Sequence, residues 1–145
     1  MDPPVNRLVL PAIAGSIPTF SEFVRSGAVA AGVAETELGK LDLVLEEILI
    51  NVARYAYGPP GGTVEVAYGQ AGPSKVHVEI ADSGRIFNPL TADPPDLSRG
   101  LADRPIGGLG VFLVKSMVDS IAYRRAGDRN ILSFKFPLDG ASGDV

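Results

Sequence analysis

The segment ETELGKLDLVLEEILINVARYAY, residues 35–57, has the clearest helical periodicity in this sequence. Its apolar side chains recur every three or four positions, as in an amphipathic helix that buries one stripe. The stripe consists of Leu38, Leu41, Leu45, Ile48, Leu49 and Val52. The segment GPPGG at 58–62 follows, and its prolines and glycines do not support a continuing helix. The pattern therefore predicts a long helix that starts near Glu35 and stops at this breaker.

Two segments after the breaker alternate between apolar and polar residues, which is the pattern of half-buried strands. They are TVEVAYG at 63–69 and KVHVEIADS at 75–83, and the short loop QAGPS joins them. A connection this short predicts an antiparallel hairpin. His77 alternates with Val76 and Val78, so we expect it on the opposite, solvent-facing side of its strand.

Further elements are expected on either side of this centre. Residues 5–12 predict a strand, and residues 16–32 predict a helix that Gly32 ends. Residues 110–121 predict a third helix, which is apolar on most sides. The chain then closes with two strands around the turn GDRN, and these strands cover residues 121–127 and 130–138.

Residues 85–107 differ from the rest of the chain, because they show no clear periodicity and are rich in proline, aspartate, glycine and arginine. Loops of this length inside a compact domain are usually functional lids or disordered segments. We expect a lid here, within a single domain that covers residues 1–138. The final residues 139–145, DGASGDV, predict a frayed tail.

The order of these elements predicts the fold class. Strands that are paired through short turns are antiparallel, and helices gathered on one face of such a sheet give two layers. We therefore expect an α/β (α+β) two-layer sandwich, with a mixed, mostly antiparallel sheet and three helices on one face.

Composition limits the possible functions. The chain has 145 residues, 46% of them hydrophobic and 21% charged, which is typical of a globular domain. Its net charge of −4 offers no basic footprint for nucleic acid. With no cysteine and one histidine, it lacks the residues for disulfides, thiolate chemistry or an ordinary zinc site. No apolar run reaches membrane-spanning length and the first residues do not form a signal peptide, so we expect a cytoplasmic protein.

Glycines crowd the start of the third predicted helix, in the segment RPIGGLGVFLV. They do not form a Walker A loop or a dinucleotide fingerprint, because Val114 and Leu113 stand where those motifs need glycine. The first amides of a helix lack internal partners and favour anions, so Gly108 and Gly110 are candidates for phosphate binding. A turn or close helix packing is the alternative explanation of the same glycines.

Two further motifs contain polar residues with chemical potential. Glu47 and Asn51 are four positions apart and so share one helix face, where a carboxylate and an amide oxygen can hold Mg²⁺ and a hydroxyl. Asp82 ends a predicted strand and can accept a hydrogen bond from an exocyclic amine, while Gly84 leaves room for a flat ring. Taken alone, the first motif also fits a solvated helix face and the second an ordinary turn.

The three motifs together, in this order, resemble the nucleotide-binding boxes of the histidine-kinase-like ATPase superfamily, which has the Bergerat fold. EEILINVARYAY looks like the N box, DSG like the first glycine box and GGLGVFLV like the second. The most similar branch is that of anti-sigma-factor serine-protein kinases, and the resemblance covers the chain from about Val5 to Leu138.

This resemblance implies a regulatory enzyme that uses ATP and Mg²⁺. It would bind a sigma factor and phosphorylate an antagonist protein on serine, without contacting nucleic acid or membrane. A homodimer is open as well. Glu47 would be the general base. The ATP-binding residues would be Asn51, Asp82, Gly84, Gly108, Gly110 and Ser133, and Asn51 would also hold Mg²⁺. Ser133 stands where the family usually has a threonine that supports the adenine through water, and the lid would close over the nucleotide.

Some positions depart from the family pattern. Tyr55 stands where many of these kinases have histidine, and Ile106 lies close to the place of a phosphate-reaching lid arginine. Arg99 or Arg104 is a possible substitute, although neither matches in place. Three alternatives therefore stay open, namely an ATP-binding module that switches partners without catalysis, an ATP domain related to histidine kinases, and an unrelated α/β fold.

Overall fold

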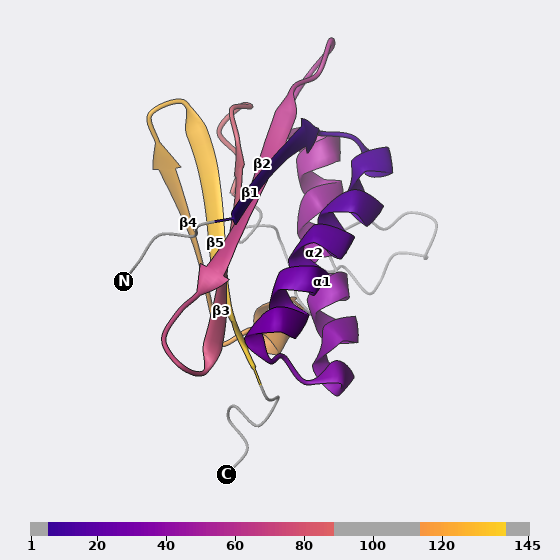
Figure 1. Ribbon diagram of the computed structural model, residues 1–145. Helices are drawn as coiled ribbons and strands as arrows, with labels where there is room; N and C mark the ends of the chain where they lie inside the picture. The colour runs from indigo at the N-terminus through magenta and orange to yellow at the C-terminus, as the bar shows by residue number, and fades with distance from the viewer. Residues whose placement is uncertain (1–5, 89–113, 139–145) are drawn as a thin grey trace, which may run out of the picture.

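The computed structural model describes residues 6–88 and 114–138, which form two layers (Figure 1). One layer is a five-stranded sheet, and the other contains the two long helices, both on the same face of the sheet. The predicted two-layer α/β sandwich is therefore confirmed. The strands are β1 (Asn6–Pro11), β2 (Thr63–Gln70), β3 (Lys75–Asp82), β4 (Ser120–Ala126) and β5 (Arg129–Pro137).

The sheet has the strand order β1-β2-β3-β5-β4, and every pairing between these five strands is antiparallel. β5 lies between β3 and β4, so the last strand of the chain is next to the central strand. In this register Asp82, at the end of β3, is opposite Asn130, at the start of β5. The β4–β5 turn contains only Gly127 and Asp128, because Ala126 and Arg129 already pair with each other.

Helices α1 (Ile17–Ala31) and α2 (Glu35–Tyr55) lie side by side against the sheet (Figure 1). α1 follows a 3₁₀ turn, η1 (Ala14–Ser16), and ends at Gly32, whose φ of 103° is left-handed and therefore favours glycine. The Arg25 guanidinium on α1 lies 2.7 Å from the Asp42 carboxylate on α2, which joins the two helices on their outer side.

The third predicted helix is described only in part. Residues 114–117 are helical, and Val114 is buried in the core. β4 begins at Ser120, so the helix is shorter at its C-terminal end than the predicted limit of 121. Its predicted first residues, 110–113, lie outside the described part of the chain.

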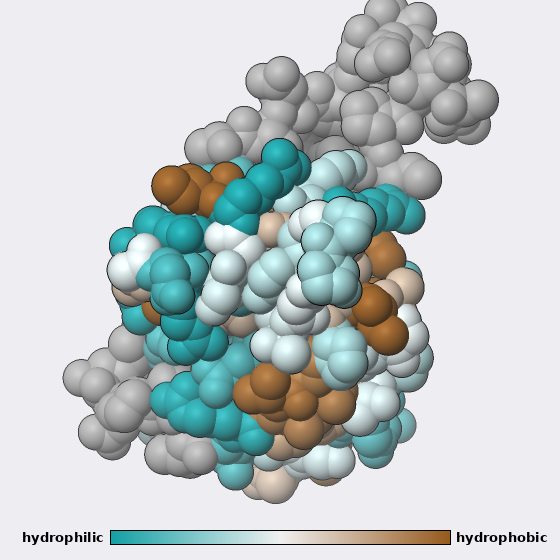
Figure 2. Space-filling model, turned by 90° about the horizontal axis from the view of Figure 1, so that it is seen from above, coloured by the Kyte–Doolittle hydropathy of each residue, from teal (hydrophilic) through white to brown (hydrophobic). Residues whose placement is uncertain are grey.

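The hydrophobic core fills the space between the helices and the sheet. Its largest fully buried side chains come from α1, α2, β2, β3 and β5 and include Phe20, Leu41, Leu45, Ile80, Phe134 and Phe136. Large apolar side chains that stay exposed come from separate elements, and the surface in Figure 2 shows apolar groups as distinct patches among polar ones. Among residues 6–88 and 114–138, no helix is long and apolar enough to cross a membrane.

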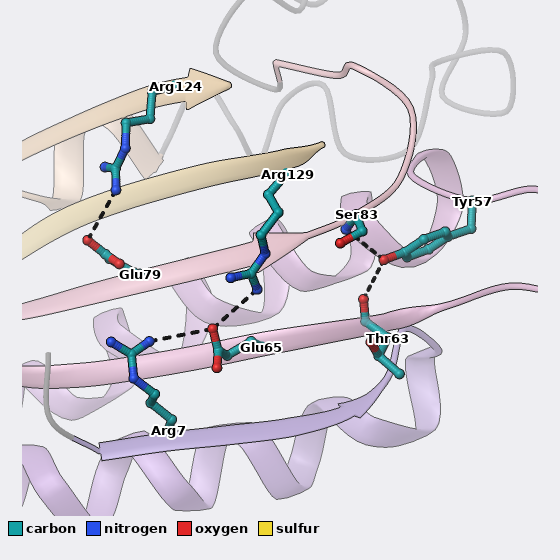
Figure 3. A network of polar contacts seen from close by, with 8 residues as sticks. All are labelled: Arg7, Tyr57, Thr63, Glu65, Glu79, Ser83, Arg124 and Arg129. Carbon is teal, nitrogen blue, oxygen red and sulfur yellow. Dashed lines mark hydrogen bonds and ion pairs between the residues drawn. The ribbon is translucent and has the colours of Figure 1, made fainter. Parts of the chain in front are cut away.

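The opposite face of the sheet is lined with charged side chains (Figure 3). Glu65 on β2 makes ion pairs with Arg7, at 3.5 Å, and with Arg129, at 3.2 Å. His77 lies on this face, as predicted, but the expectation that it is solvent-facing is wrong, because its exposed fraction is only 6%. Its ring lies between cross-strand neighbours, and its Nε2 is 3.7 Å from a carboxylate oxygen of Glu79. Burial lowers the pKa of His77, while the Glu79 carboxylate opposes this shift.

Candidate functional site

The Asp82 carboxylate is a buried acceptor where β3 meets β5. The residue is 5% exposed, and its Oδ1 accepts hydrogen bonds from the Gly84 amide and from Nδ2 of Asn130, both at 2.9 Å. No residue within 6–88 or 114–138 donates a hydrogen bond to the second oxygen, Oδ2. Asp82 therefore keeps an acceptor available for a ligand.

Gly84 packs directly on the C-terminal end of α2. A Cβ atom at this position would lie 2.1 Å from the carbonyl oxygen of Ala56, and the next amide, Arg85 N–H, donates to that same oxygen at 2.8 Å. The absent side chain is therefore needed for close contact between two backbone segments. The expected role of Gly84 in leaving room for a flat ring stays a prediction, and the structure assigns this glycine a packing role.

Two tyrosines fix the loop that follows β3, namely Tyr55, the last residue of α2, and Tyr57, two residues after it. The Tyr57 hydroxyl accepts a hydrogen bond from the Ser83 amide at 2.8 Å and donates to the Thr63 carbonyl at 2.6 Å (Figure 3). The Tyr55 ring lies 5.4 Å from the Phe87 ring, between centroids. Helix α2 therefore positions the first residues of the predicted lid.

Glu47 and Asn51 meet on α2, as their spacing predicts. Asn51 Nδ2 donates to Glu47 Oε2 at 3.1 Å, across one helical turn. Asn51 is 3% exposed and lies beside the apolar stripe of the helix, while Glu47 is half-buried. The pair therefore sits at the margin of the core rather than on a fully solvated helix face.

The environment of Glu47 makes its carboxylate a stronger base. Burial raises the pKa of Glu47, and the neighbouring Glu46 carboxylate adds to this. The hydrogen bond from Asn51 and the charge of Arg54 act in the opposite direction. Desolvation is the largest of these effects, so the pKa of Glu47 lies above its ordinary value. Such a shift suits a carboxylate that has to accept a proton near neutral pH.

The chemistry of Asn51 fits a magnesium ligand. Because its Nδ2 is turned to Glu47, its Oδ1 points away from that carboxylate, and none of the described residues donates to it. Mg²⁺ prefers hard oxygen ligands and commonly takes one or two from the protein and the rest from phosphates and water. The described residues contain no cluster of three or more His, Cys, Asp or Glu that could hold a metal, so an ion here would depend on Asn51 and a nucleotide.

Ser133 is not brought together with Asp82. Along β5, Leu132 and Phe134 point into the core, so the intervening Ser133 points to the other face of the sheet. Its cross-strand partners are Glu79 and Ala122, and Glu79 contacts Arg124 and His77 on that face. The assignment of Ser133 to the nucleotide site is therefore not supported by its position.

Asn130 occupies the place that was expected for Ser133. It is 4% exposed. Its side-chain carboxamide forms hydrogen bonds with Asp82, with the backbone of the loop after β3 and with two side chains of β4. The sequence contains a signal for this residue that was missed. Asn130 has the same parity as Leu132, Phe134 and Phe136, so it is a polar residue in a core-facing series. Buried polar groups require partners, and such a position therefore indicates a built polar site.

Several predicted residues cannot be compared with the structure. Gly108 and Gly110 lie outside the described residues, and so does most of the predicted lid, from residue 89 to 107. The positions Arg99, Arg104 and Ile106 belong to the same segment. Their expected roles stay predictions.

Comparison with known proteins identifies the family. Residues 10–136 match the model of the family described as "Histidine kinase-like ATPase domain". The serine-protein kinase RsbW of Bacillus mycoides is 23% identical over 109 residues, which cover 72% of this chain and 68% of that protein. The RsbW of Bacillus cereus is 24% identical over the same share of both chains.

Solved structures show the same fold at low identity. A crystal structure of RsbU and RsbW domains from Mycobacterium tuberculosis superposes with a TM-score of 0.65 and 16% identity, over 94% of this chain. The chain spans about a third of that longer protein, 32% of its length. The blue-light activated histidine kinase of Erythrobacter litoralis superposes with a TM-score of 0.56 and 17% identity, over 78% of this chain and 34% of the kinase. The family match covers most of the chain and includes both Glu47 and Asp82, and the chain therefore belongs to the histidine kinase-like ATPase domain family.

Proposed function

We propose that this protein is an ATP-dependent serine-protein kinase that regulates a partner protein. The proposal rests most directly on the Glu47–Asn51 pair, in which a half-buried carboxylate with a raised pKa is hydrogen-bonded to a buried amide. The two RsbW relatives are themselves named serine-protein kinases, which supports the same activity. We place the protein in the cytoplasm, where ATP and protein substrates are available.

In this proposal the adenine base of ATP lies against Asp82, and its exocyclic amine donates to Oδ2. Asn51 Oδ1 would hold a Mg²⁺ ion, which when bound neutralises charge on the phosphates. We expect the amides of Gly108 and Gly110 to bind the same phosphates, as glycines at a helix start can do. Asn130 takes the supporting role that the resemblance gave to Ser133, because it touches Asp82 and Ser133 does not.

The transfer step depends on Glu47. A serine hydroxyl of the protein substrate lies against this carboxylate, which accepts the hydroxyl proton as the serine oxygen bonds to the γ-phosphorus. The bond between that phosphorus and the oxygen that bridges to the β-phosphate breaks, and ADP leaves. Phosphoserine and a protonated Glu47 result, and the proton then passes to solvent.

The partners follow from the named relatives. We propose that the chain binds a sigma factor and phosphorylates an antagonist that competes for it. The protein from Mycobacterium tuberculosis joins RsbU and RsbW domains in one chain, which is consistent with regulation through further protein domains. A homodimer is part of the same proposal, and its mass can be measured directly in solution.

The test is phosphoryl transfer from γ-labelled ATP to candidate antagonist proteins. Wild-type protein is expected to give acid-stable phosphoserine. Glu47→Gln is expected to lower the rate by roughly 10²–10⁴-fold, with ATP affinity close to wild type, because a general base acts only during transfer. Glu22→Gln is the matched control, because Glu22 is exposed and lies on the other long helix, α1, and we expect it to retain activity.

Two other results would change the assignment. Wild-type protein that binds ATP but labels no antagonist would act as a partner-switching module without catalysis. Label that appears on histidine and is lost in acid would instead indicate a function related to histidine kinases.

A further inference from the structure

The carboxamide of Asn130 has one possible orientation. Its Oδ1 accepts from the Tyr123 hydroxyl at 2.6 Å, from Nη1 of Arg125 at 3.2 Å and from the Phe87 amide at 3.2 Å. Arginine and a backbone amide can only donate, and an Asn NH₂ group can only donate as well. A flipped carboxamide would therefore place donors against donors in a site that is 4% exposed.

The orientation of Asn130 determines what Asp82 can do. With Oδ1 facing β4 and Phe87, Nδ2 has to face Asp82 Oδ1, at 2.9 Å, and the Arg85 carbonyl, at 2.7 Å. Asp82 Oδ1 also accepts from the Gly84 amide, so it receives two donors, and Oδ2 is the carboxylate oxygen that these donors leave available.

β4 keeps this arrangement in place from outside the nucleotide site. Arg125 Nη1 donates to the Gly84 carbonyl at 2.9 Å as well as to Asn130, so one guanidinium spans the loop and the strand. Tyr123 and Arg125 are two positions apart on β4 and therefore share the face of Asn130. A network of four side chains thus ends at the carboxylate of Asp82.

We propose that Asn130, oriented by Tyr123 and Arg125, is a specificity-determining positioning residue that restricts Asp82 to accepting hydrogen bonds. Asp82 Oδ2 then accepts from a base with an amino group at position 6, as in adenine. It opposes a base that presents a carbonyl oxygen there, because two acceptors would face each other without a proton between them. This inference rests on the proposed nucleotide site, and it adds a network that selects the base.

Inosine triphosphate is a suitable probe, because it differs from ATP only in the 6-oxo group and the proton on N1. Isothermal calorimetry with ATP and with inosine triphosphate gives the ratio of the two dissociation constants. Tyr123→Phe removes one of the three donors to Asn130 and changes no atom at Asp82. The matched control is Tyr68→Phe, because Tyr68 lies on β2 and packs on Phe23, away from this network.

We expect wild-type protein to bind ATP more tightly than inosine triphosphate. The 6-oxo group cannot donate to Asp82 Oδ2, and an acceptor left without a donor in a buried site strongly disfavours a ligand. Tyr123→Phe should reduce this preference by about 3–10-fold, the equivalent of one hydrogen bond, while Tyr68→Phe leaves it unchanged. Asn130→Leu, of similar size, should reduce it further. The change should come from weaker ATP binding, with inosine triphosphate bound as well as before or better.

A loss of affinity that is equal for both nucleotides would mean that the network only supports the fold, and would overturn the inference. An unchanged ratio in both Tyr123→Phe and Asn130→Leu would overturn it as well. Failure of the proposed nucleotide site is distinguishable, because then the wild-type protein binds neither nucleotide. Failure of the kinase activity alone leaves nucleotide binding, and this comparison of affinities, intact.

Discussion

Replacing Gly84 with alanine should destabilise the protein through one identifiable contact. The new methyl carbon would lie 2.1 Å from the Ala56 carbonyl oxygen and 2.6 Å from its carbon. Both atoms belong to the backbone at the end of α2, so rotation of a side chain cannot relieve the overlap. The loop and the helix end have to separate by roughly 1 Å, which is a typical response to overpacking.

The size of the effect follows from two contributions. Overpacking of a close contact costs about 1–3 kcal/mol in unfolding free energy. Separation also weakens the 2.8 Å hydrogen bond from Arg85 N–H to the same carbonyl, which contributes about 0.5–1.5 kcal/mol. We therefore expect Gly84→Ala to lower the unfolding free energy by about 2–4 kcal/mol.

Urea denaturation followed by circular dichroism measures this difference. Gly39→Ala is the control, because Gly39 lies inside α2 and an added Cβ would meet no atom within 4 Å. Alanine is favoured over glycine in a helix interior, so this control should gain about 0.5–1 kcal/mol. A Gly84→Ala variant with wild-type stability but impaired ATP binding would refute the packing argument and return Gly84 to the role of shaping an adenine pocket.

Three further predictions concern single polar residues. Asp82→Asn retains one acceptor oxygen but replaces the other with a donor. It should cost on the order of 1.5–3 kcal/mol in ATP affinity and abolish the preference for adenine over guanine nucleotides. Unchanged ATP affinity in calorimetry would contradict the proposed contact between Asp82 and the adenine base. Because folding raises the pKa of Glu47, the native state binds its proton more tightly, and the stability of the wild type relative to Glu47→Gln should fall as pH rises through that raised pKa, in urea titrations at several pH values. Folding lowers the pKa of His77, so the unfolded state binds the proton more tightly. The unfolding free energy should therefore fall as pH drops below 6.5, the ordinary pKa, and His77→Gln should lack this pH-dependent loss. Parallel pH profiles of the two proteins would show that His77 does not titrate on unfolding.

Local sequence patterns determined the main helices and strands, and within the site they determined the Glu47–Asn51 pair and the position of Asp82. The stripe of α2 follows from helical spacing, and the same spacing brings Asn51 within 3.1 Å of Glu47. Alternation along β3 places Asp82 at its buried end, and Gly32 ends α1 in the left-handed conformation. These features depend on residues within one turn or one strand of each other, so the sequence alone contains their cause.

Tertiary structure decided which residue of β5 completes the site. Asn130 and Ser133 are three positions apart, and an odd separation on a strand places them on opposite faces of the sheet. Parity alone makes Asn130 core-facing, but only the pairing of β5 with β3 brings it to Asp82, which is 48 residues away in the sequence. Likewise, Gly84 is required by the backbone of Ala56, the residue that caps α2, and His77 is buried by its neighbours in the sheet. Such long-range contacts come from strand register and layer packing, which no local spacing in the sequence encodes.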